Sequence, residues 1–456
     1  MQTVFLFISN NAYASDLLRT RFIVELAARF HVLAFLAPGA LAGGAPYPAL
    51  SNLTYIERAI QHPKFWILFG KLLRYSMIRK YDFEPVVARN RLKGMRDWRR
   101  RALRTLSYAL PQCWITNDLF TWLETLLVPR NRAWEELLRR YEPAIILTCS
   151  PGFNHFDAEA VVYARKYCAP TAAINFNWDN LHNGGVHFRR TDYLCLWNDH
   201  MKGVAVREYG YVPENVFISG PVRFDNHISP QRSLPTREEF LRSKNLDPRE
   251  KMILLTTITD GNYPEEHLVL ADILAARERG VFAGYPNIFV RLHPKEDGRR
   301  FASLLASPPR NFHLEAAGKR RATAAGSAVE LDEEDIANLT ATLRYADVNT
   351  NYRSTLSIEA ILCDTPVVNI CYPDRYARGY SHRHYVPLLE SGAVRLVRSP
   401  EDLMTALNAH LTDPSLGAVE RSRAREQLMP RADGTAYKRL VDMIEICVTI
   451  APRVVL

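Results

Sequence analysis

The sequence predicts an α/β protein built from two halves, each with a parallel β-sheet. The chain has 456 residues, about three times the length of a typical single domain. Short apolar runs alternate with helical patterns along most of it, which is typical of βαβ units. A polar, proline-containing stretch over 229–249 interrupts this alternation and predicts a linker between the halves.

The first domain is expected to span 1–228. A helix is predicted over 17–29, between the first two strands. Each predicted strand is a short apolar run followed by polar or turn-forming residues; the runs lie at 3–10, 31–37, 144–150, 171–176, 192–198 and 215–220. A basic, helix-like insertion over about 55–140 separates the second strand from the third.

The second domain is expected to span 250–430. Its predicted strands have the same character and lie at 251–259, 287–294, 346–351 and 365–372. Residues 299–335 contain little that could be buried, so we expect this stretch to be poorly ordered. A closing helix is predicted over 436–450, within a final segment 431–456, and we expect it to pack on one of the two domains.

Composition narrows the class of protein. The hydrophobic fraction of 47% and the charged fraction of 23% are ordinary for a soluble enzyme and exclude a disordered or fibrous chain. No window approaches the roughly 18 uncharged apolar residues of a membrane-spanning helix, and the N-terminal apolar run lacks the flanks of a signal peptide. The seven cysteines are scattered without a C-x-x-C pair, which indicates neither a disulfide framework nor a zinc site. We therefore expect a cytoplasmic protein.

The positive charge is concentrated in one segment. Residues 71–104 carry an excess of nine basic over acidic residues, which equals the net charge of the whole chain. Basic and apolar side chains, including Trp98, interleave over 65–104, so this segment could rest on the inner face of an anionic membrane. It could equally cover the protein's own core. No RNA- or DNA-binding pattern accompanies it, and we expect no nucleic-acid partner.

Polar residues follow the predicted strands of the second half, at the ends where parallel sheets bind ligands. Ser354 and Thr355 follow one strand and precede a predicted helix. Free backbone amides at a helix start favour an anion such as phosphate. Glu359 lies one turn later and could accept hydrogen bonds from a ribose. An ordinary helix cap with a surface glutamate would give the same pattern.

Two further strand ends carry candidate ligand contacts. One predicted strand delivers Arg291 and His293 to its carboxyl end, and a proline then stops the strand. Another strand ends at Asp260 and Gly261, where glycine permits close backbone approach to a phosphate. Asp260 could equally be a plain turn residue. The coincidence of polar residues at several strand ends predicts a ligand site.

In this order, the motifs resemble the C-terminal, nucleotide-sugar-binding half of GT-B glycosyltransferases. They are a strand ending in T-D-G, then R-x-H-P, then N-x-N-x-x-S-T-x-S-x-E-A, followed by T-P-V-V-N. Upstream, the W-D-N run at 178–180 and the G-x-x-x-F-D run at 220–225 are similar to those of bacterial surface-polysaccharide enzymes. These include CDP-glycerol glycerophosphotransferase-like and capsule-type transferases. The resemblance covers about 140–410 and leaves the basic insertion outside it.

The resemblance implies a GT-B fold, in which two Rossmann-like, doubly wound domains face a cleft. It implies that Ser354, Thr355 and Glu359 hold the donor's phosphate and ribose. His293 would contact the donor phosphate or protonate the leaving nucleotide, as in the His-Pro motif of GT-B sialyltransferases. Those enzymes also carry an acidic D/E-D/E-G motif in their first domain. Here the comparable string, at Asp260, lies in the second half and lacks the first acid, so this part of the resemblance fails.

Glycosyl transfer needs a base for the acceptor hydroxyl and compensation for charge on the leaving phosphate. In the first half, Asp179 and Asp157 are the candidate bases, with His155 third; each could instead be a turn or cap residue. Trp178 and Asn180 lie in the same predicted loop as Asp179 and are expected to face the cleft.

No D-x-D motif stands at a strand end, so no metal ion or other cofactor is expected. Arg291 and Arg353 would neutralise the phosphates instead. The ring-rich segment over 380–385 follows the last predicted strand, and its His384 is a candidate cleft-wall residue. A surface loop is the alternative reading of that segment.

The sequence thus predicts an inverting, metal-independent glycosyltransferase. It would move a sugar or related group from a nucleotide-activated donor to a bacterial surface glycan or lipid-linked acceptor. A nucleotide-sugar 2-epimerase can use the same fold without an acceptor, and a non-catalytic basic binding protein could retain it. The basic insertion favours the transferase, because a small soluble substrate gives no reason for membrane contact.

Overall fold

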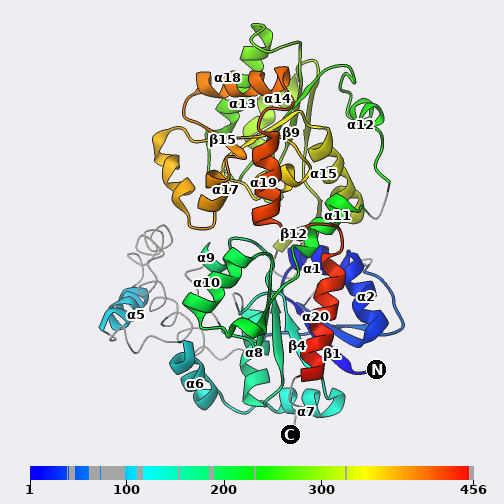
Figure 1. Cartoon of the computed structure of the whole chain (residues 1–456), viewed down its shortest axis with the longest axis vertical. Helices are drawn as coiled ribbons and strands as arrows, with labels where there is room; N and C mark the ends of the chain where they lie inside the picture. Colours follow the sequence, from blue (N-terminus) through cyan, green and yellow to red (C-terminus); the bar gives the residue numbers. More distant parts are fainter. Residues whose placement is uncertain are drawn as a thin grey trace. The chain divides into compact units, whose positions relative to one another are not determined.

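The computed structural model describes residues 1–38, 40, 47–60, 72, 98–109, 117–152, 155–183, 189–230, 233–323 and 326–450. The chain forms two compact units, and each contains a parallel β-sheet flanked by helices (Figure 1). Unit 1 comprises Met1–Arg223, Ala322–Gly326 and Thr435–Leu456, and unit 2 comprises Phe224–Arg321 and Ser327–Gly434. The predicted α/β class with two parallel sheets is confirmed.

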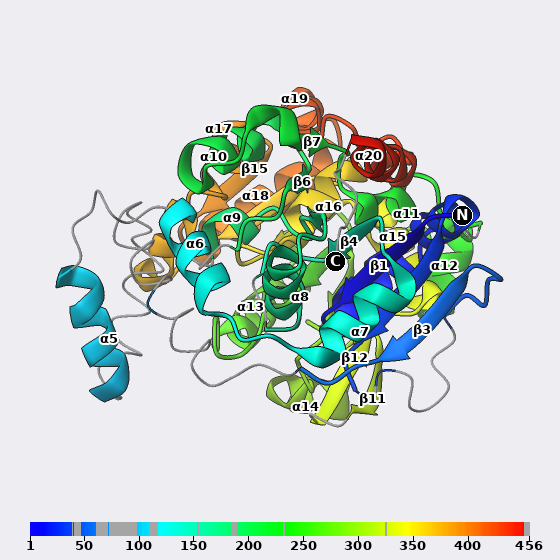
Figure 2. The same ribbon diagram turned by 90° about the horizontal axis from the view of Figure 1, so that it is seen from below.

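Unit 1 contains a seven-stranded sheet in the order β3-β2-β1-β4-β5-β6-β7, parallel throughout. All six predicted strands are present, and β3 is an additional strand at the sheet edge (Figure 2). The strands are β1 (Thr3–Ile8), β2 (His31–Leu36), β3 (Leu53–Glu57), β4 (Ile145–Thr148), β5 (Thr171–Ile174), β6 (Tyr193–Leu196) and β7 (Val216–Ile218).

The single helix predicted over 17–29 is in fact two helices. The hydroxyl of Thr20 accepts a hydrogen bond from the amide of Phe22 and begins a new helix there. The helices of unit 1 are α1 (Asn11–Leu18), α2 (Arg21–Arg29), α5 (Trp98–Ala109), α6 (Asn117–Leu127), α7 (Arg132–Tyr141), α8 (His155–Lys166), α9 (Asn180–Asn183), α10 (Asp199–Tyr209), η2 (Pro213–Asn215) and α20 (Ala436–Ile450).

The C-terminal helix α20 completes the core of unit 1. It lies beside α2, from the opposite end of the sequence (Figure 1). Leu440 and Ile444 of α20 are fully buried in one cluster with the apolar side chains of α2 and the central strands. On the solvent side, the guanidinium of Arg29 pairs with Asp442 at 2.6 Å and with Glu445 at 2.9 Å.

Unit 2 contains a six-stranded parallel sheet in the order β10-β9-β8-β13-β14-β15. The four predicted strands are its central strands, and β10 and β15 form its two edges. The strands are β8 (Met252–Thr256), β9 (Asn287–Arg291), β10 (Phe312–Glu315), β13 (Val348–Asn351), β14 (Val367–Ile370) and β15 (Val394–Val397).

The stretch 299–335, expected to be poorly ordered, contains regular structure. It provides the edge strand β10, which pairs with β9 and buries Phe312, and a separate two-stranded sheet of β11 (Lys319–Thr323) and β12 (Gly326–Glu330). Pairing to an existing strand orders β10 although its sequence offers little to bury. The prediction of disorder was therefore wrong for the described part of this stretch.

The stretch 229–249, predicted as a linker, contains a helix that buries Phe240 and Leu241 in unit 2. The helices of this unit are α11 (Asp225–Ile228), α12 (Arg237–Ser243), α13 (Glu266–Glu278), η4 (Arg299–Phe301), α14 (Ala302–Ala306), α15 (Glu333–Tyr345), α16 (Leu356–Leu362), η5 (Asp374–Ser381), α17 (Val386–Glu390), α18 (Pro400–Thr412) and α19 (Ala418–Leu428); η3 (Val222–Phe224) stands at the boundary of the two units.

Most of the basic segment over 65–104 lies outside the described residues, which resume at Trp98 in α5. The expectation of membrane contact by this segment falls mainly on that part of the chain. Within the part that the structure describes, no helix combines the length and apolar character needed to cross a bilayer.

Replacing Leu440 by Ala should lower the free energy of unfolding of unit 1 by about 2–5 kcal/mol, because it leaves a cavity between α20 and the sheet. Ile446, on the same helix but about half exposed, is the matched control. Its replacement by Ala should change the unfolding free energy by no more than about 0.5 kcal/mol in urea titrations. Equal effects of the two substitutions would show that α20 is not part of the core.

Candidate functional site

Both sheets have a topological switch point, where neighbouring strands lead to helices on opposite sides. In unit 2 this point lies between β8 and β13, and β9 is the next strand beyond β8. The predicted donor residues Asp260, His293 and Arg353 follow these three adjacent strands. The amide of His293 donates to the hydroxyl of Thr257 at 2.9 Å, which joins the loops after β9 and β8 directly. The structure therefore brings these candidates to one edge of one sheet.

The loop after β8 is held by a buried ionic network. The amide of Asp260 donates to Glu296 at 2.7 Å, and Glu296 pairs with Arg300 at 3.0 Å. Arg300 also pairs with Glu266 at 2.6 Å, and Glu266 accepts from the amide of Ile258. Beyond this network, the side chain of Asp260 is exposed to solvent. The loop backbone is thus fixed while its tip stays accessible.

At the tip of this loop, Gly261 occupies a position where the packing would also accept a residue with a side chain. A Cβ atom added there would meet no atom within 4 Å. The fold therefore does not need a glycine at this position, and the open space beside it is compatible with a bound ligand.

His293 is a neutral hydrogen-bond donor at neutral pH. Its Nδ1 accepts from the amide of Lys295 at 3.1 Å, so the proton of the neutral ring resides on Nε2. Burial, with Lys295 and Arg300 nearby, lowers the pKa of His293 to about 4. The ring can therefore donate from Nε2 to a phosphate oxygen, but it does not carry an acidic proton until an anion raises its pKa.

The turn between β13 and α16 is organised by the side chain of Asn351. Its Oδ1 accepts from the amide of Ser354 at 3.0 Å, from the hydroxyl of Ser357 at 3.1 Å and from Asn369 at 3.0 Å. The amide of Leu356 donates to Oγ of Ser354 at 3.2 Å. Two amides that were expected to be free for a phosphate are therefore already bonded within the turn.

Arg353 and Thr355 occupy the same turn. Arg353 has a φ of +45°, in the left-handed region that non-glycine residues rarely adopt. Its Nε is buried and has no hydrogen-bond partner in the described part of the chain. Thr355 precedes α16, and its side chain makes no capping bond. A strained backbone and an unsatisfied cationic donor make Arg353 the strongest candidate for an anion contact.

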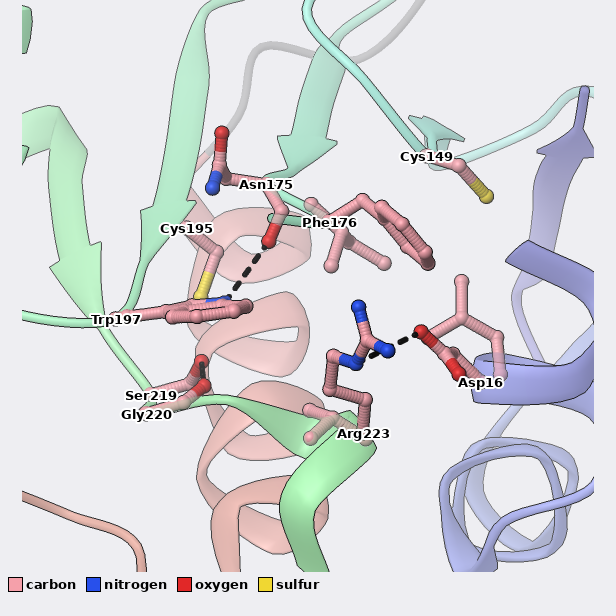
Figure 3. A pocket seen from close by; sticks show the side chains of 12 residues that line it. Asp16, Cys149, Asn175, Phe176, Cys195, Trp197, Ser219, Gly220 and Arg223 are labelled. Atoms are coloured by element: carbon pink, nitrogen blue, oxygen red, sulfur yellow. Dashed lines mark hydrogen bonds and ion pairs between the residues drawn. The ribbon is translucent and has the colours of Figure 1, made fainter. Parts of the chain in front are cut away.

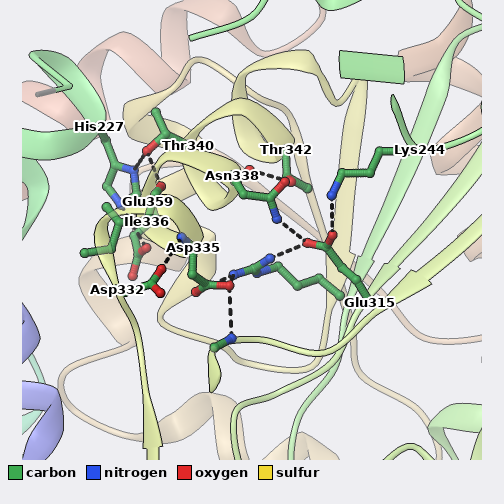
Figure 4. A network of polar contacts seen from close by, with 12 residues as sticks. His227, Lys244, Glu315, Asp332, Asp335, Ile336, Asn338, Thr340, Thr342 and Glu359 are labelled. Carbon is green, nitrogen blue, oxygen red and sulfur yellow. Dashed lines mark hydrogen bonds and ion pairs between the residues drawn. The ribbon is translucent and has the colours of Figure 1, made fainter. Parts of the chain in front are cut away.

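Glu359 lies inside unit 2 and contacts a histidine that sequence reasoning did not select (Figure 4). The hydroxyl of Thr340 donates to the carbonyl of Ile336, so it accepts from Nδ1–H of His227 at 2.9 Å. Nε2 of His227 faces Oε2 of Glu359 at 3.1 Å. His227 therefore orients the carboxyl group of Glu359. The signal for His227 was its place in the run F-D-N-H that ends the upstream motif.

Arg291 does not belong with the phosphate candidates. Its buried guanidinium pairs with Glu315 of β10 and, at 2.9 Å, with Asp335 of α15. Glu315 also binds Lys244 at 2.7 Å. The charge of Arg291 is thus compensated within the fold, by carboxylates that its own sequence neighbourhood does not contain.

His384 is buried rather than part of an open wall, and its ring stands edge-on to His382. The adjacent Tyr385 donates to Asn369 at 2.5 Å. The segment over 380–385 therefore packs against the amide network around Asn351.

In unit 1, Asp157 has a structural position. It is fully buried and accepts hydrogen bonds from Ser9 at 3.1 Å and from Ser150. These serines follow β1 and β4, so Asp157 joins the two strand ends at the switch point of this sheet. A carboxylate in this position is not presented to solvent.

The other acceptor-side candidates lie nearby in the sequence but differ in exposure. Asp179 and Asn180 are half-buried, Trp178 is buried, and His155 is exposed at the start of α8. Nδ2 of Asn180 is a buried donor with no hydrogen-bond partner among the residues that the structure describes. Asp179 is therefore the more accessible of the two predicted carboxylates.

A small pocket lies at the carboxyl ends of β4 to β7 (Figure 3). The guanidinium of Arg223 lies 5.1 Å from the ring centroid of Phe176 and 3.6 Å from Oδ2 of Asp16. Trp197 and Asn175 also line it, and none of the predicted catalytic residues does. Sequence reasoning missed Arg223, although it stands within the G-x-x-x-F-D run.

No protein-family model and no curated protein sequence matches this chain. Solved structures do resemble it. UDP-GlcNAc 2-epimerase from Neisseria meningitidis, bound to UDP-GlcNAc, has a TM-score of 0.55 and 13% identity over 98% of this chain and 100% of that one. S. aureus MnaA with UDP gives 0.54 and 11%, over 99% and 98% of the two chains. The wall teichoic acid polymerase TagF gives 0.52 and 11%, over 98% and 89%. These likenesses confirm the expected GT-B fold.

The lowered pKa of His293 makes stability depend on pH. The unfolded chain protonates this residue near pH 6.5 and the folded chain only near pH 4, so folding stability should fall as the pH drops through this range. In His293→Gln, the pH dependence of the urea midpoint between pH 7 and pH 4 should be shallower than in the wild type. An unchanged slope would show that His293 titrates normally in the folded protein.

Proposed function

We propose that this chain is an enzyme acting on a nucleotide-activated sugar or related group, which it transfers to a surface glycan or lipid-linked acceptor. The observation that carries the proposal is the grouping of polar side chains at the carboxyl ends of β9, β8 and β13 in unit 2. There, the neutral His293 follows β9 and Arg353, with its unsatisfied Nε, follows β13, the two strands on either side of β8. Similar structures contain UDP-GlcNAc or UDP, which supports a nucleotide donor for this fold.

On the donor side, Arg353 would pair with the diphosphate and His293 would donate to one of its oxygens from Nε2. Ser354 accepts from the amide of Leu356, which leaves its hydroxyl proton free to donate to the phosphate. Thr355 offers a second hydroxyl. Glu359, oriented by His227, would accept hydrogen bonds from the ribose.

On the acceptor side, we propose Asp179 as the base, because Asp157 is fully buried between two serine hydroxyls. Asp179 would take the proton of the acceptor hydroxyl as its oxygen attacks the sugar's anomeric carbon. The bond to the donor phosphate breaks at the same time. The charge that develops on the leaving phosphate would be stabilised by Arg353 and His293, without a metal ion.

A nucleotide-sugar 2-epimerase is the second candidate. The specific observation in its favour is the TM-score of 0.55 with the neisserial epimerase over nearly the whole length of both chains. Such an enzyme would need the same donor contacts but no acceptor.

The testing experiment begins with a thermal-shift panel of CMP, CDP, UDP and GDP and continues with activity assays in EDTA. Turnover of a nucleotide sugar only when a glycan or lipid-linked acceptor is present would support transfer. Conversion of UDP-GlcNAc alone would identify an epimerase instead. Nucleotide binding without turnover of any donor would indicate a binding protein, and activity that returns only with magnesium or manganese would contradict metal independence.

Replacing His293 by Ala, or Ser354 and Thr355 together by Ala, should weaken nucleotide binding about tenfold or more, because each change removes donors to a charged phosphate. The fold should persist, since these residues lie at strand ends rather than in the core. Ser415→Ala, at an exposed position after α18 in the same unit, is the control. Wild-type nucleotide affinity in both variants would exclude this donor site.

We also propose that the segment over 65–104 attaches the protein reversibly to anionic membrane. Three apolar side chains support this, since Trp98 within the segment and Trp122 and Leu126 of α6 are each more than half exposed. The protein should co-sediment with anionic but not neutral vesicles, and salt should release only part of it. Trp122→Ser should reduce the salt-resistant part. Equal pelleting with both lipids, or with neither, would contradict membrane attachment.

A further inference from the structure

A groove of about 660 Å³ lies in unit 2 at the amino ends of the strands, opposite the strand ends that carry the candidate donor site. Val367 and Val394, which begin β14 and β15, line it together with residues of α18 and α19. The candidate donor residues follow the carboxyl ends of the strands, whereas this groove is at the amino ends. No residue that we place in the donor site lines it.

His410, in the last turn of α18, is the unusual feature of the groove. Its side chain lines the groove, and the residue is only 7% exposed. Nδ1 is buried, and the ring makes no hydrogen bond within the described part of the chain. Buried polar groups are almost always paired, because an unpaired one loses its hydration without compensation. A ligand in the groove would bond to the other ring nitrogen, Nε2, which is not among these buried atoms.

Positive charge surrounds this ring. Arg421 lines the groove and is anchored through Nε to Asp364 at 3.0 Å, and Arg395 lines it with a mostly exposed side chain. Burial lowers the pKa of His410 to about 4, with smaller contributions in the same direction from Arg421 and Arg395, while Asp413 raises it. Glu420 is the one acidic residue of the lining, and its side chain packs beside Gly392. Two guanidinium groups thus line the groove with this ring, and each is paired with one carboxylate.

Apart from Thr405 and two glycines, the rest of the lining is apolar. It comprises Val367, Ala393, Val394, Leu396, Ala406, Ala409 and Leu416. A cationic end with an imidazole and a long apolar surface match a ligand that combines an anionic group with a hydrocarbon chain.

We propose that this groove binds an amphipathic organic anion, whose carboxylate or phosphate contacts His410 and Arg395 while its apolar chain lies along β15 and α18. This site is separate from the proposed donor site and does not depend on the proposed function. A phosphate and a carboxylate share the chemistry that the groove recognises, so the experiment includes both.

The test is calorimetric titration of the whole protein with octyl phosphate and with octanoate, below their micellar concentrations. Octanol and inorganic phosphate serve as ligand controls, because each carries only one half of the proposed chemistry. His410→Phe keeps a ring but removes both nitrogens, and Arg395→Gln removes an exposed charge that pairs with Asp402. Arg249→Gln is the matched control, because Arg249 is an exposed arginine paired with Asp247 outside the groove.

We expect saturable binding of at least one of the two anions, weakened about tenfold or more in His410→Phe and in Arg395→Gln, and unchanged in Arg249→Gln. Arg395→Gln lies on the surface, so it tests the proposal even if His410→Phe fails to fold. Absence of saturable binding, or equal binding by all four proteins, would overturn the proposal. Octanol or inorganic phosphate binding as tightly as the anions would also overturn it.

Discussion

The side chain of Asn351 is the contact on which the candidate site of unit 2 depends. It is completely buried at the end of β13, where an amide without partners would be costly. Its Oδ1 gathers the amide of Ser354, the hydroxyl of Ser357 and the side chain of Asn369, while its Nδ2 donates to Asn349 at 2.7 Å. The start of α16 is thereby locked to two strands. The left-handed backbone of Arg353 lies inside this locked turn, and the surrounding bonds hold it there.

The neighbouring loops are held in the same way, by hydrogen bonds and ion pairs of buried polar groups. Arg300 joins Glu296 to Glu266 and so holds the loop that carries Asp260. The hydroxyl of Thr257 receives the amide of His293. The side chains proposed to contact a donor thus extend from loops that are already held by hydrogen bonds and ion pairs within the protein. Loops held in this way can position ligand contacts without any further ordering of their backbone on binding.

The sequence revealed the strand ends because parallel strands bring their carboxyl ends to one edge, so a polar residue after each buried run marks that edge. It did not reveal β3, β10 and β15, whose edge positions leave several residues partly exposed and break the apolar run. Arg291 was misread for a related reason. Its partners Glu315 and Asp335 lie 24 and 44 residues away, and only the packing of β10 and α15 brings them to it.

Helix α16 is bonded to other elements at both ends, and these bonds determine the position of Glu359. Its start is tied to β13 through Asn351, and its end leads to Asp364, which pairs with Arg421 at 3.0 Å and Arg425 at 3.1 Å of α19. Between these fastenings, His227 holds the carboxyl group of Glu359 from a third element, α11. A shift of Glu359 along the helix axis would break one set of bonds or the other. Its position is therefore set by the fold before any ligand binds, and the same α19 arginine that lines the groove forms part of that support.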